Sequence, residues 1–363
     1  MTVGSPEVTV VIPSYNGVRY LGEAIESVLA QTHRSLETVV VDDGSVDETR
    51  ALVARYGDRV RYLHQENRGL AAARNTGIRA ARGTYLAFLD HDDRYLPEKI
   101  ARQVAVFRER PPVGLVHTGW HFIDEHGRRV GQRGWSPEEG DVFAVLLLGN
   151  LVHPGAVMVR RDVVEEVGGF DEARTGLEDW DLWLRLAQRG VPWGRVDAPL
   201  LEYRVHPGQM HKHGPERRLT NQLATLGRIF ADTGLRAEIR ALEPRAYQNV
   251  YLRAAADYYR AGARIDGSRA FHAAVRARPA LLTESRSLRG FCRQLVPTGF
   301  QRLDVAAAHW RTVSGTLRNA VGDLLASPDL EPEIAALRWR ARLTVLRVTA
   351  TLLRKRARAP RPA

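Results

Sequence analysis

Three carboxylates occur within four residues, directly after an apolar segment. The segment Tyr85–Leu89 has the composition of a buried strand, and it is followed by Asp90, His91, Asp92 and Asp93. Like charges at this spacing repel one another, and burying them without partners is costly. Hard cations such as Mg²⁺ and Mn²⁺ prefer carboxylate oxygens and leave coordination positions open for substrate phosphates. The pattern therefore predicts a divalent metal site, with His91 as a bystander.

A second pair of acids follows another apolar segment. In LETVVVDDGS, Asp42 and Asp43 end a predicted strand, and Tyr15 ends the predicted strand VTVVIPSY. A tyrosine ring at a strand end can stack on a nucleotide base, and the Asp42 carboxylate can accept the imide N–H of uracil or thymine. Ser45 and Glu48 have the spacing of a capping box at the start of a helix.

Alternating strand-like and helix-like segments would position these residues. Strands are expected at 8–15, 36–42, 60–65 and 84–90, with helices at 18–31, 45–56, 69–81 and from about 97 onward. Apolar strands in this order predict an α/β fold with a mainly parallel sheet and helices on both faces. Ligands of such sheets bind beyond the carboxyl ends of the strands. The acids at 42, 43, 90 and 92 are therefore expected to share a cleft with Tyr15.

The pattern changes after about residue 110. Two strands are expected around an EHGR turn, followed by a helical stretch near 140–149, the strand GAVMVRR and an amphipathic helix in GLEDWDLWLRLAQRG. Beyond about Pro215 the sequence is typical of helices throughout. We therefore predict an α/β domain over 1–214, an all-α extension over 215–330 and a basic, partly amphipathic tail over 331–363.

The N-terminal blocks resemble a known family. VTVVIPSYNGVRYLGEAIESVLAQTHRSLETVVVDDGSVDET and NRGLAAARNTGIRAARGTYLAFLDHDD are similar to the family 2 inverting glycosyltransferases of the GT-A fold, from about Val8 to about His206. The resemblance implies a Rossmann-like GT-A sheet. It also implies transfer of a sugar from a nucleotide-sugar donor, UDP or dTDP being favoured, to an acceptor hydroxyl with Mn²⁺ or Mg²⁺. The acceptor would be a carbohydrate or lipid-linked molecule of cell-surface polysaccharide or glycolipid synthesis.

The same resemblance implies roles for individual residues. The nucleotide-sugar pocket would comprise Pro13, Tyr15, Asp42, Asp43, Arg74, Asp90 and Asp92. Asp92 is the favoured metal ligand and Asp93 the second choice, and His206 in EYRVHPG would complete the metal shell. His153 falls where the family lines its acceptor pocket.

The block GLEDWDLW would supply the catalytic base. Inverting transfer needs a group that takes the acceptor proton while the hydroxyl attacks C1. By the resemblance Asp179 is that base, and Glu178 orients it or binds the acceptor. The simpler interpretation is that these acids favour a helix N-terminus. Trp180 and Trp183 are expected in the core.

Composition limits the compartment and the partners. A net charge of +11 and a pI near 10.2 favour a polyanionic partner, and the single cysteine excludes an internal disulfide framework. We see no signal peptide, and the apolar stretch at 142–159 is interrupted too soon to span a membrane. A cytoplasmic protein is expected.

The basic tail could be a solvated helix face or a peripheral anchor on the inner membrane face. In the second case its apolar side chains would enter lipid: Leu337, Trp339, Leu343, Leu346 and Val348.

Three alternatives compete with a transferase. A basic nucleic-acid-binding protein would fit the charge, but no helix-turn-helix, zinc finger or aromatic-bearing RNA-binding sheet motif is visible. The acidic cleft would also repel phosphates unless metal is bound, so no nucleic acid partner is expected. A sugar-1-phosphate nucleotidyltransferase would need a glycine-rich loop with Arg and Lys near the first strand, which IPSYNGVRY lacks. A non-catalytic glycosyltransferase-like scaffold is disfavoured by the intact Asp42, Asp92 and Asp179.

Overall fold

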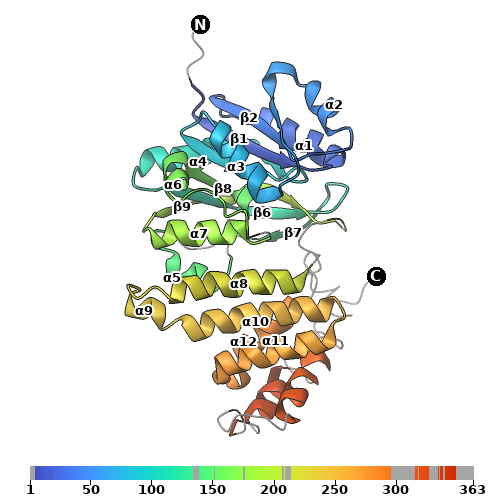
Figure 1. The fold of residues 1–363 in the computed structure, drawn as a ribbon, viewed down its shortest axis with the longest axis vertical. Helices are drawn as coiled ribbons and strands as arrows, with labels where there is room; N and C mark the ends of the chain where they lie inside the picture. The colour runs from blue at the N-terminus through green and yellow to red at the C-terminus, as the bar shows by residue number, and fades with distance from the viewer. Residues whose placement is uncertain are drawn as a thin grey trace. The chain divides into compact units, whose positions relative to one another are not determined.

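The computed structural model describes two compact units of the chain. The described residues are 5–133, 139–150, 152–174, 176–206, 208, 214–295, 315–317, 319–326, 334, 336–337 and 340–348. The units comprise Met1–Met210 and His211–Ala363 (Figure 1). Strands occur in the first unit, and the described elements of the second are helices.

The first unit is built on one mixed sheet (Figure 1). Its strands are β1 Val8–Ser14, β2 Leu36–Asp42, β3 Arg61–His64, β4 Tyr85–Phe88, β5 Arg94–Tyr95, β6 Leu115–Ile123, β7 Arg129–Arg133, β8 Val157–Arg160 and β9 Trp193–Arg204. Their order is β3-β2-β1-β4-β8-β6-β9-β5, and β7 pairs with β6.

The N-terminal strands are parallel and end at the same edge. β1 pairs in parallel with β2 and β4, and β2 pairs in parallel with β3, whereas β8 is antiparallel to both β4 and β6. Ser14 lies opposite Asp42, and Val11 lies opposite Phe88. The acids that follow β2 and β4 are therefore brought to one end of the sheet. The predicted α/β fold class is confirmed.

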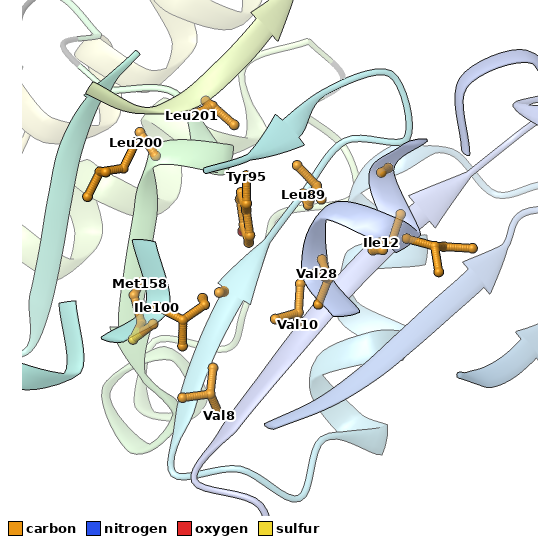
Figure 2. Packing of buried hydrophobic residues seen from close by; sticks show 14 of the residues in the cluster. Val8, Val10, Ile12, Val28, Leu89, Tyr95, Ile100, Met158, Leu200 and Leu201 are labelled. Atoms are coloured by element: carbon orange, nitrogen blue, oxygen red, sulfur yellow. The ribbon is translucent and has the colours of Figure 1, made fainter. Parts of the chain in front are cut away.

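Helices cover both faces of this sheet. They are α1 Val18–Leu29, α2 Thr49–Ala54, α3 Leu70–Ala80, α4 Lys99–Glu109, α5 Phe143–Leu146, α6 Arg161–Glu166 and α7 Glu178–Gln188, with 3₁₀ turns η1 Gly57–Arg59 and η2 Pro154–Ala156. Because side chains alternate along a strand, Val10 and its even-numbered neighbours in β1 share one face. They belong to a buried cluster with Val28 of α1 and Ile100 of α4 (Figure 2).

The opposite face of β1 packs closely on α3. A Cβ added to Gly77 of α3 would lie 2.3 Å from Cγ1 of Val11. The absence of a side chain at this position lets the helix backbone approach the strand, and this approach places Arg74, one turn earlier, near the carboxyl ends of the strands.

Two local predictions in this unit need correction. The capping box at Ser45 is wrong, because α2 begins only at Thr49 and the Ser45 hydroxyl instead accepts a hydrogen bond from the backbone N–H of Asn16. The Asp47 carboxylate accepts the backbone N–H of Thr49. Residues 45–48 therefore lie before α2 and do not form its first turn. The helix expected over 140–149 is a single turn, α5.

The second unit contains α8 Pro215–Phe230, α9 Ala237–Arg240, α10 Glu243–Arg260, α11 Arg264–Ala277, the 3₁₀ turn η4 Pro279–Thr283 and α12 Ser285–Gln294. Helices are present beyond Pro215, as predicted, and the consecutive helices α10 and α11 pack against each other. Ala255 of α10, Phe271 of α11 and Phe291 of α12 share one buried cluster. Among the described helices of the chain, none is long and apolar enough to cross a membrane.

The predicted basic tail falls partly outside the described residues, Trp339 and 349–363 included. The segment 340–348 is helical. Leu343 and Leu346 are exposed, whereas Val348 is buried. The apolar side chains proposed to enter lipid are thus divided between the surface and the core of the unit.

Gly77→Ala should destabilise the protein, whereas Gly22→Ala should not. The new methyl group at 77 would meet Val11, an overpacking that costs about 1–3 kcal/mol. Gly22 also lies within a helix, but its nearest atoms are 3.8 Å from an added Cβ, so alanine there should be neutral or stabilise by roughly 0.5–1 kcal/mol. Urea unfolding followed by circular dichroism measures both changes. Equal stabilities for the two variants would contradict the close packing of α3 on β1.

Candidate functional site

The loop after β4 gathers the first group of acids. Its tight turn is closed by a hydrogen bond from the backbone N–H of Asp93 to the carbonyl of Asp90. The Oδ2 atom of Asp92 lies 3.0 Å from Nε2 of His206, which follows β9. The structure therefore brings together Asp92 and His206, two predicted metal ligands that are 114 residues apart.

Arg74 joins this loop to the second acidic block. Its guanidinium is 1% exposed and donates to Oδ1 of Asp90 at 2.6 Å and to Oε1 of Glu178 at 2.8 Å. It also lies 5.3 Å from the centre of the Phe170 ring. Burial would raise the pKa of Asp90, but the Arg74 charge prevails and lowers it. Arg74 thus pairs with two carboxylates and holds them close together, a role that the sequence did not indicate.

Asp93 is the least satisfied acid of the loop. Its Oδ1 accepts the backbone N–H of Arg204, whereas its buried Oδ2 has no hydrogen-bond partner among the described residues. Burial and the charges of Asp92 and Asp90 hold the pKa of the Asp93 carboxyl well above its usual range. A buried carboxylate with a free oxygen beside two other carboxylates is the environment that a cation would stabilise.

His153 lies against the same acids. Its Nε2 is 3.6 Å from Asp90 Oδ2, and ligand atoms of Asp90, Asp93 and His153 lie within 4.8 Å of one another. However, Nδ1 of His153 accepts the backbone N–H of Gly155, and burial lowers the pKa of this histidine. A neutral imidazole with Nδ1 as acceptor carries its hydrogen on Nε2. His153 therefore presents an N–H group to Asp90 and is a poorer metal ligand than the neighbouring carboxylates.

Asp92 and His206 fit two neighbouring ligand positions around a divalent metal. Octahedral coordination at about 2.1 Å separates neighbouring ligand atoms by about 3 Å, which is the separation between Asp92 Oδ2 and His206 Nε2. The Oδ2 atom of Asp93 is another hard ligand, but it groups with Asp90 and His153, whose ligand atoms lie within 4.8 Å of one another.

Asp179, the catalytic base predicted from the block GLEDWDLW, lies in the first turn of α7. Burial and the charge of Glu178 raise the pKa of Asp179 to about 6. Its Oδ2 accepts a hydrogen bond from Nδ2 of Asn150 at 2.8 Å. Glu178 is buried and ion-paired to Arg74, whereas Asp179 remains partly exposed. The two adjacent acids therefore have different environments: Glu178 is held by a cation, and Asp179 can reach solvent or a ligand. Trp180 and Trp183 are buried, as expected.

The predicted nucleotide residues at the end of β1 differ in accessibility. Pro13 is buried within β1, opposite Val41, whereas Tyr15 is 48% exposed. The ring of Tyr15 is thus available for stacking on a base.

Asp42 and Asp43 are both buried and bonded to protein donors. Asp42 accepts hydrogen bonds from the N–H of Ser45 and from the hydroxyl of Tyr62. Asp43 accepts the backbone N–H groups of Arg68 and Gly69 and the side-chain amide of Gln65. Asp43 thus fixes the loop that leads into α3. Among the described residues, no hydrogen bond or ion pair joins Asp42 or Asp43 to the acids that follow β4.

Arg204 is a residue that the sequence analysis missed. Its fully buried side chain donates to the carbonyl of Asp92 and to Glu23 of α1 and lies 4.4 Å from the centre of the Tyr20 ring. Its backbone N–H binds Asp93. Arg204 thereby fastens the acidic loop to α1 and to the strand that precedes His206. Its place two residues before His206, at the end of β9, is the signal that could have found it.

Comparison with known sequences gives consistent matches. A sequence model described as "Glycosyl transferase family 2" matches residues 9–168. An uncharacterised glycosyltransferase of Rickettsia prowazekii is 37% identical over 210 residues, which cover 56% of this chain and 66% of that protein. A relative from Rickettsia felis is matched over 36% of its length. The chain thus spans less than two thirds of these relatives. TuaG of Bacillus subtilis, named as a candidate teichuronic acid biosynthesis glycosyltransferase, is 32% identical over 56% of this chain and 81% of its own length.

Solved structures show the same fold. S. aureus TarS, residues 1–349 in complex with UDP, has a TM-score of 0.54 and 16% identity, over 96% of this chain and 91% of that chain. The mannosyltransferase PcManGT from Pyrobaculum calidifontis, in complex with GDP-Man and Mn²⁺, has a TM-score of 0.53 and 20% identity, over 96% and 87% of the two chains.

Replacing Arg74 by Met should destabilise the protein far more than replacing Arg68 by Met. Loss of Arg74 leaves the buried Glu178 and the partly buried Asp90 without their cation, which costs about 3–5 kcal/mol. Arg68 forms a solvent-exposed pair with Glu172, whose loss costs about 0–1 kcal/mol. The free energy of unfolding in urea at neutral pH distinguishes them. A small effect at Arg74 would show that its ion pairs do not hold the site together.

Proposed function

The chain belongs to glycosyl transferase family 2, and we propose that it transfers a sugar from a nucleotide-sugar donor to an acceptor hydroxyl with inversion at C1. Two groups of acids at the carboxyl edge of the sheet support this proposal. The acids after β4 suit a donor diphosphate with its metal, and Asp179 suits an acceptor hydroxyl. Arg74 connects the two groups.

Asp179 is the proposed catalytic base. Its raised pKa, about 6, makes it a stronger base than an ordinary carboxylate while leaving it mostly ionised at neutral pH. Glu178 cannot take this role easily, because Arg74 holds its Oε1. Glu178 instead raises the pKa of its neighbour by charge repulsion. The proton of the acceptor hydroxyl would pass to Asp179 as the oxygen attacks C1.

On the donor side, Asp92, Asp93 and His206 would hold Mn²⁺ or Mg²⁺. Such an ion, when bound, neutralises negative charge on the departing diphosphate. Arg204 keeps the loop in place through its bonds to Asp92 and Asp93. Asp90, paired with Arg74, would contact the nucleotide sugar, and the exposed ring of Tyr15 would stack on the base.

Uracil or thymine is the base we propose. Asp42 would contribute a remaining lone pair to the imide N–H, since a carboxylate can accept about four hydrogen bonds. Pro13 and Asp43 would support the same pocket by shaping the ends of β1 and β2. TarS, which shares the fold, binds UDP and UDP-GlcNAc in its own structures.

The acceptor class we propose is a cell-surface polysaccharide or glycolipid. This follows the names of relatives, TuaG among them. His153 would line the acceptor side, where its Nε2–H faces Asp90. Peripheral contact with the inner membrane face through Leu343, Leu346 and neighbouring arginines is part of the same proposal.

The observation that carries the proposal is the joining of the two acid groups by Arg74. The decisive experiment measures binding and hydrolysis of UDP-, dTDP- and GDP-sugars with Mn²⁺ or with chelator, for wild type, Asp92→Ala and Asp179→Asn. We expect one nucleotide class to bind in a metal-dependent manner, with loss in Asp92→Ala. Asp179→Asn should retain binding and lose turnover by about 10²- to 10⁴-fold. If no nucleotide sugar binds with metal present, the transferase proposal fails.

The rate of transfer should depend on a group with a pKa of about 6. The base must be ionised, and the pKa of Asp179 is raised to about 6, so activity should be constant above that pH and fall below it by about tenfold per pH unit. Initial rates at saturating donor and acceptor, measured across the acidic range, test this. A profile that stays flat down to the usual carboxylate pKa of about 4 would exclude Asp179 as the base.

Asn150→Ala should move the acidic limb of this profile to higher pH. The hydrogen bond from Asn150 lowers the pKa of Asp179, so its removal should raise that pKa and reduce the ionised fraction near neutrality. Asn67→Ala, which removes an exposed amide, serves as the control and should leave the limb unchanged. If the acidic limb stays at the same pH and only the maximal rate falls, Asn150 would instead contact the substrate.

A further inference from the structure

A pocket of about 390 Å³ lies at the end of the sheet opposite the acids. It is formed where α1 ends, where β2 and β3 begin, and at the turn between α3 and β4. Glu37 in its wall and Asp42 of the acidic edge are five residues apart on β2, which corresponds to about 17 Å along an extended strand. The pocket is therefore separate from the proposed catalytic site.

The lining of this pocket is strongly basic. Its arginines are Arg34, Arg59, Arg61 and Arg82, and its acids are Glu37 and Asp58. Four guanidinium groups thus face two carboxylates, an excess of two positive charges. We call this the basic pocket.

Glu37 is already occupied by the fold. Its Oε1 accepts hydrogen bonds from the hydroxyl of Thr9 and from the backbone N–H of Arg82, and its Oε2 lies 3.9 Å from Arg61. Arg61 in turn donates to the carbonyl of Ala80. These bonds fix one acid and one arginine as the wall of the pocket. They leave Glu37 little capacity to neutralise the other arginines.

The remaining arginines lack counter-charges. In the part of the chain that the structure describes, the guanidinium groups of Arg34, Arg59 and Arg82 form no hydrogen bond or ion pair. Arg59 stacks over the Tyr56 ring at 5.5 Å, which orients it without neutralising it. These three arginines are exposed. Guanidinium groups that line one cavity repel one another, and an anion bound there would relieve this repulsion.

We propose that the basic pocket binds a phosphorylated ligand. A phosphate or diphosphate group matches the double positive excess, and guanidinium forks pair with its oxygens in a bidentate manner. The phosphate would contact Arg59 and Arg82, with Arg61 behind them. Leu29 and Leu36, also in the lining, offer an apolar surface for the rest of the ligand.

Inorganic pyrophosphate is the probe that tests the pocket. Binding to the full chain is measured by isothermal titration calorimetry in chelator, which withholds metal from the acidic edge. Arg59→Gln/Arg82→Gln should bind about tenfold more weakly, because each removed group makes charge-assisted hydrogen bonds. Both residues are exposed, so the variant should keep the wild-type thermal unfolding midpoint.

The matched control is Arg55→Gln/Arg102→Gln. It removes the same charge from two exposed arginines outside the pocket and should weaken binding by less than about twofold. Equal weakening in both double variants, or no binding of pyrophosphate by wild type, would overturn the proposal. Donor-sugar binding with Mn²⁺ is measured in parallel, so that failure here is distinguishable from failure of the transferase proposal.

Vesicles identify the source of the phosphate. Phosphatidylcholine vesicles with and without phosphatidylglycerol are sedimented with wild type and with Arg59→Gln/Arg82→Gln. Sedimentation that needs phosphatidylglycerol and is lost in the variant assigns a lipid headgroup. Pyrophosphate binding without such a loss assigns a soluble phosphorylated compound.

Discussion

The buried guanidinium of Arg74 is the interaction on which the site depends. It pairs with Asp90 and Glu178, which lie 16 and 104 residues away in the sequence. A buried cation must be paired, and each of these carboxylates would be costly to bury without it. The pairing therefore fixes α3, the loop after β4 and the first turn of α7 relative to one another. It also distinguishes the two acids, because Glu178 is paired with Arg74, whereas Asp179 accepts hydrogen bonds from Asn150 and from the backbone N–H of Trp180.

A second buried arginine organises the other side of the same loop. Arg204 binds the backbone of Asp92 and the carboxylate of Glu23, and its own N–H binds Asp93. Arg74 and Arg204 thus hold the loop after β4 from two sides. They do not neutralise all of its carboxylates, because Arg74 also pairs with Glu178 and Arg204 also pairs with Glu23. Asp93 retains an oxygen without a hydrogen-bond partner among the described residues. The loop therefore keeps a negative charge, which a divalent cation would neutralise.

The two ends of the sheet have opposite electrostatic character. The carboxyl ends of β2 and β4 lead into acids, whereas the amino ends of β2 and β3 border the basic pocket. The overall charge of +11 conceals this division. Because parallel strands place all their carboxyl ends at one edge, residues that follow consecutive strands in the sequence accumulate there. The acidic edge and the basic pocket can therefore coexist in one small unit without neutralising each other.

The sequence by itself determined the α/β class and the positions of the acids at strand ends. Both follow from local patterns, namely apolar runs and the residues that terminate them. It did not determine how β2 leads into α2, because Asn16 binds the Ser45 hydroxyl and Asp42 accepts the Ser45 N–H, the two groups that a capping box would use.

Only the tertiary structure decided the partners: Arg74 with Glu178, Asn150 with Asp179, and Asp92 with His206. These pairs depend on sheet order and helix packing, which bring distant segments together through interactions that no local pattern encodes.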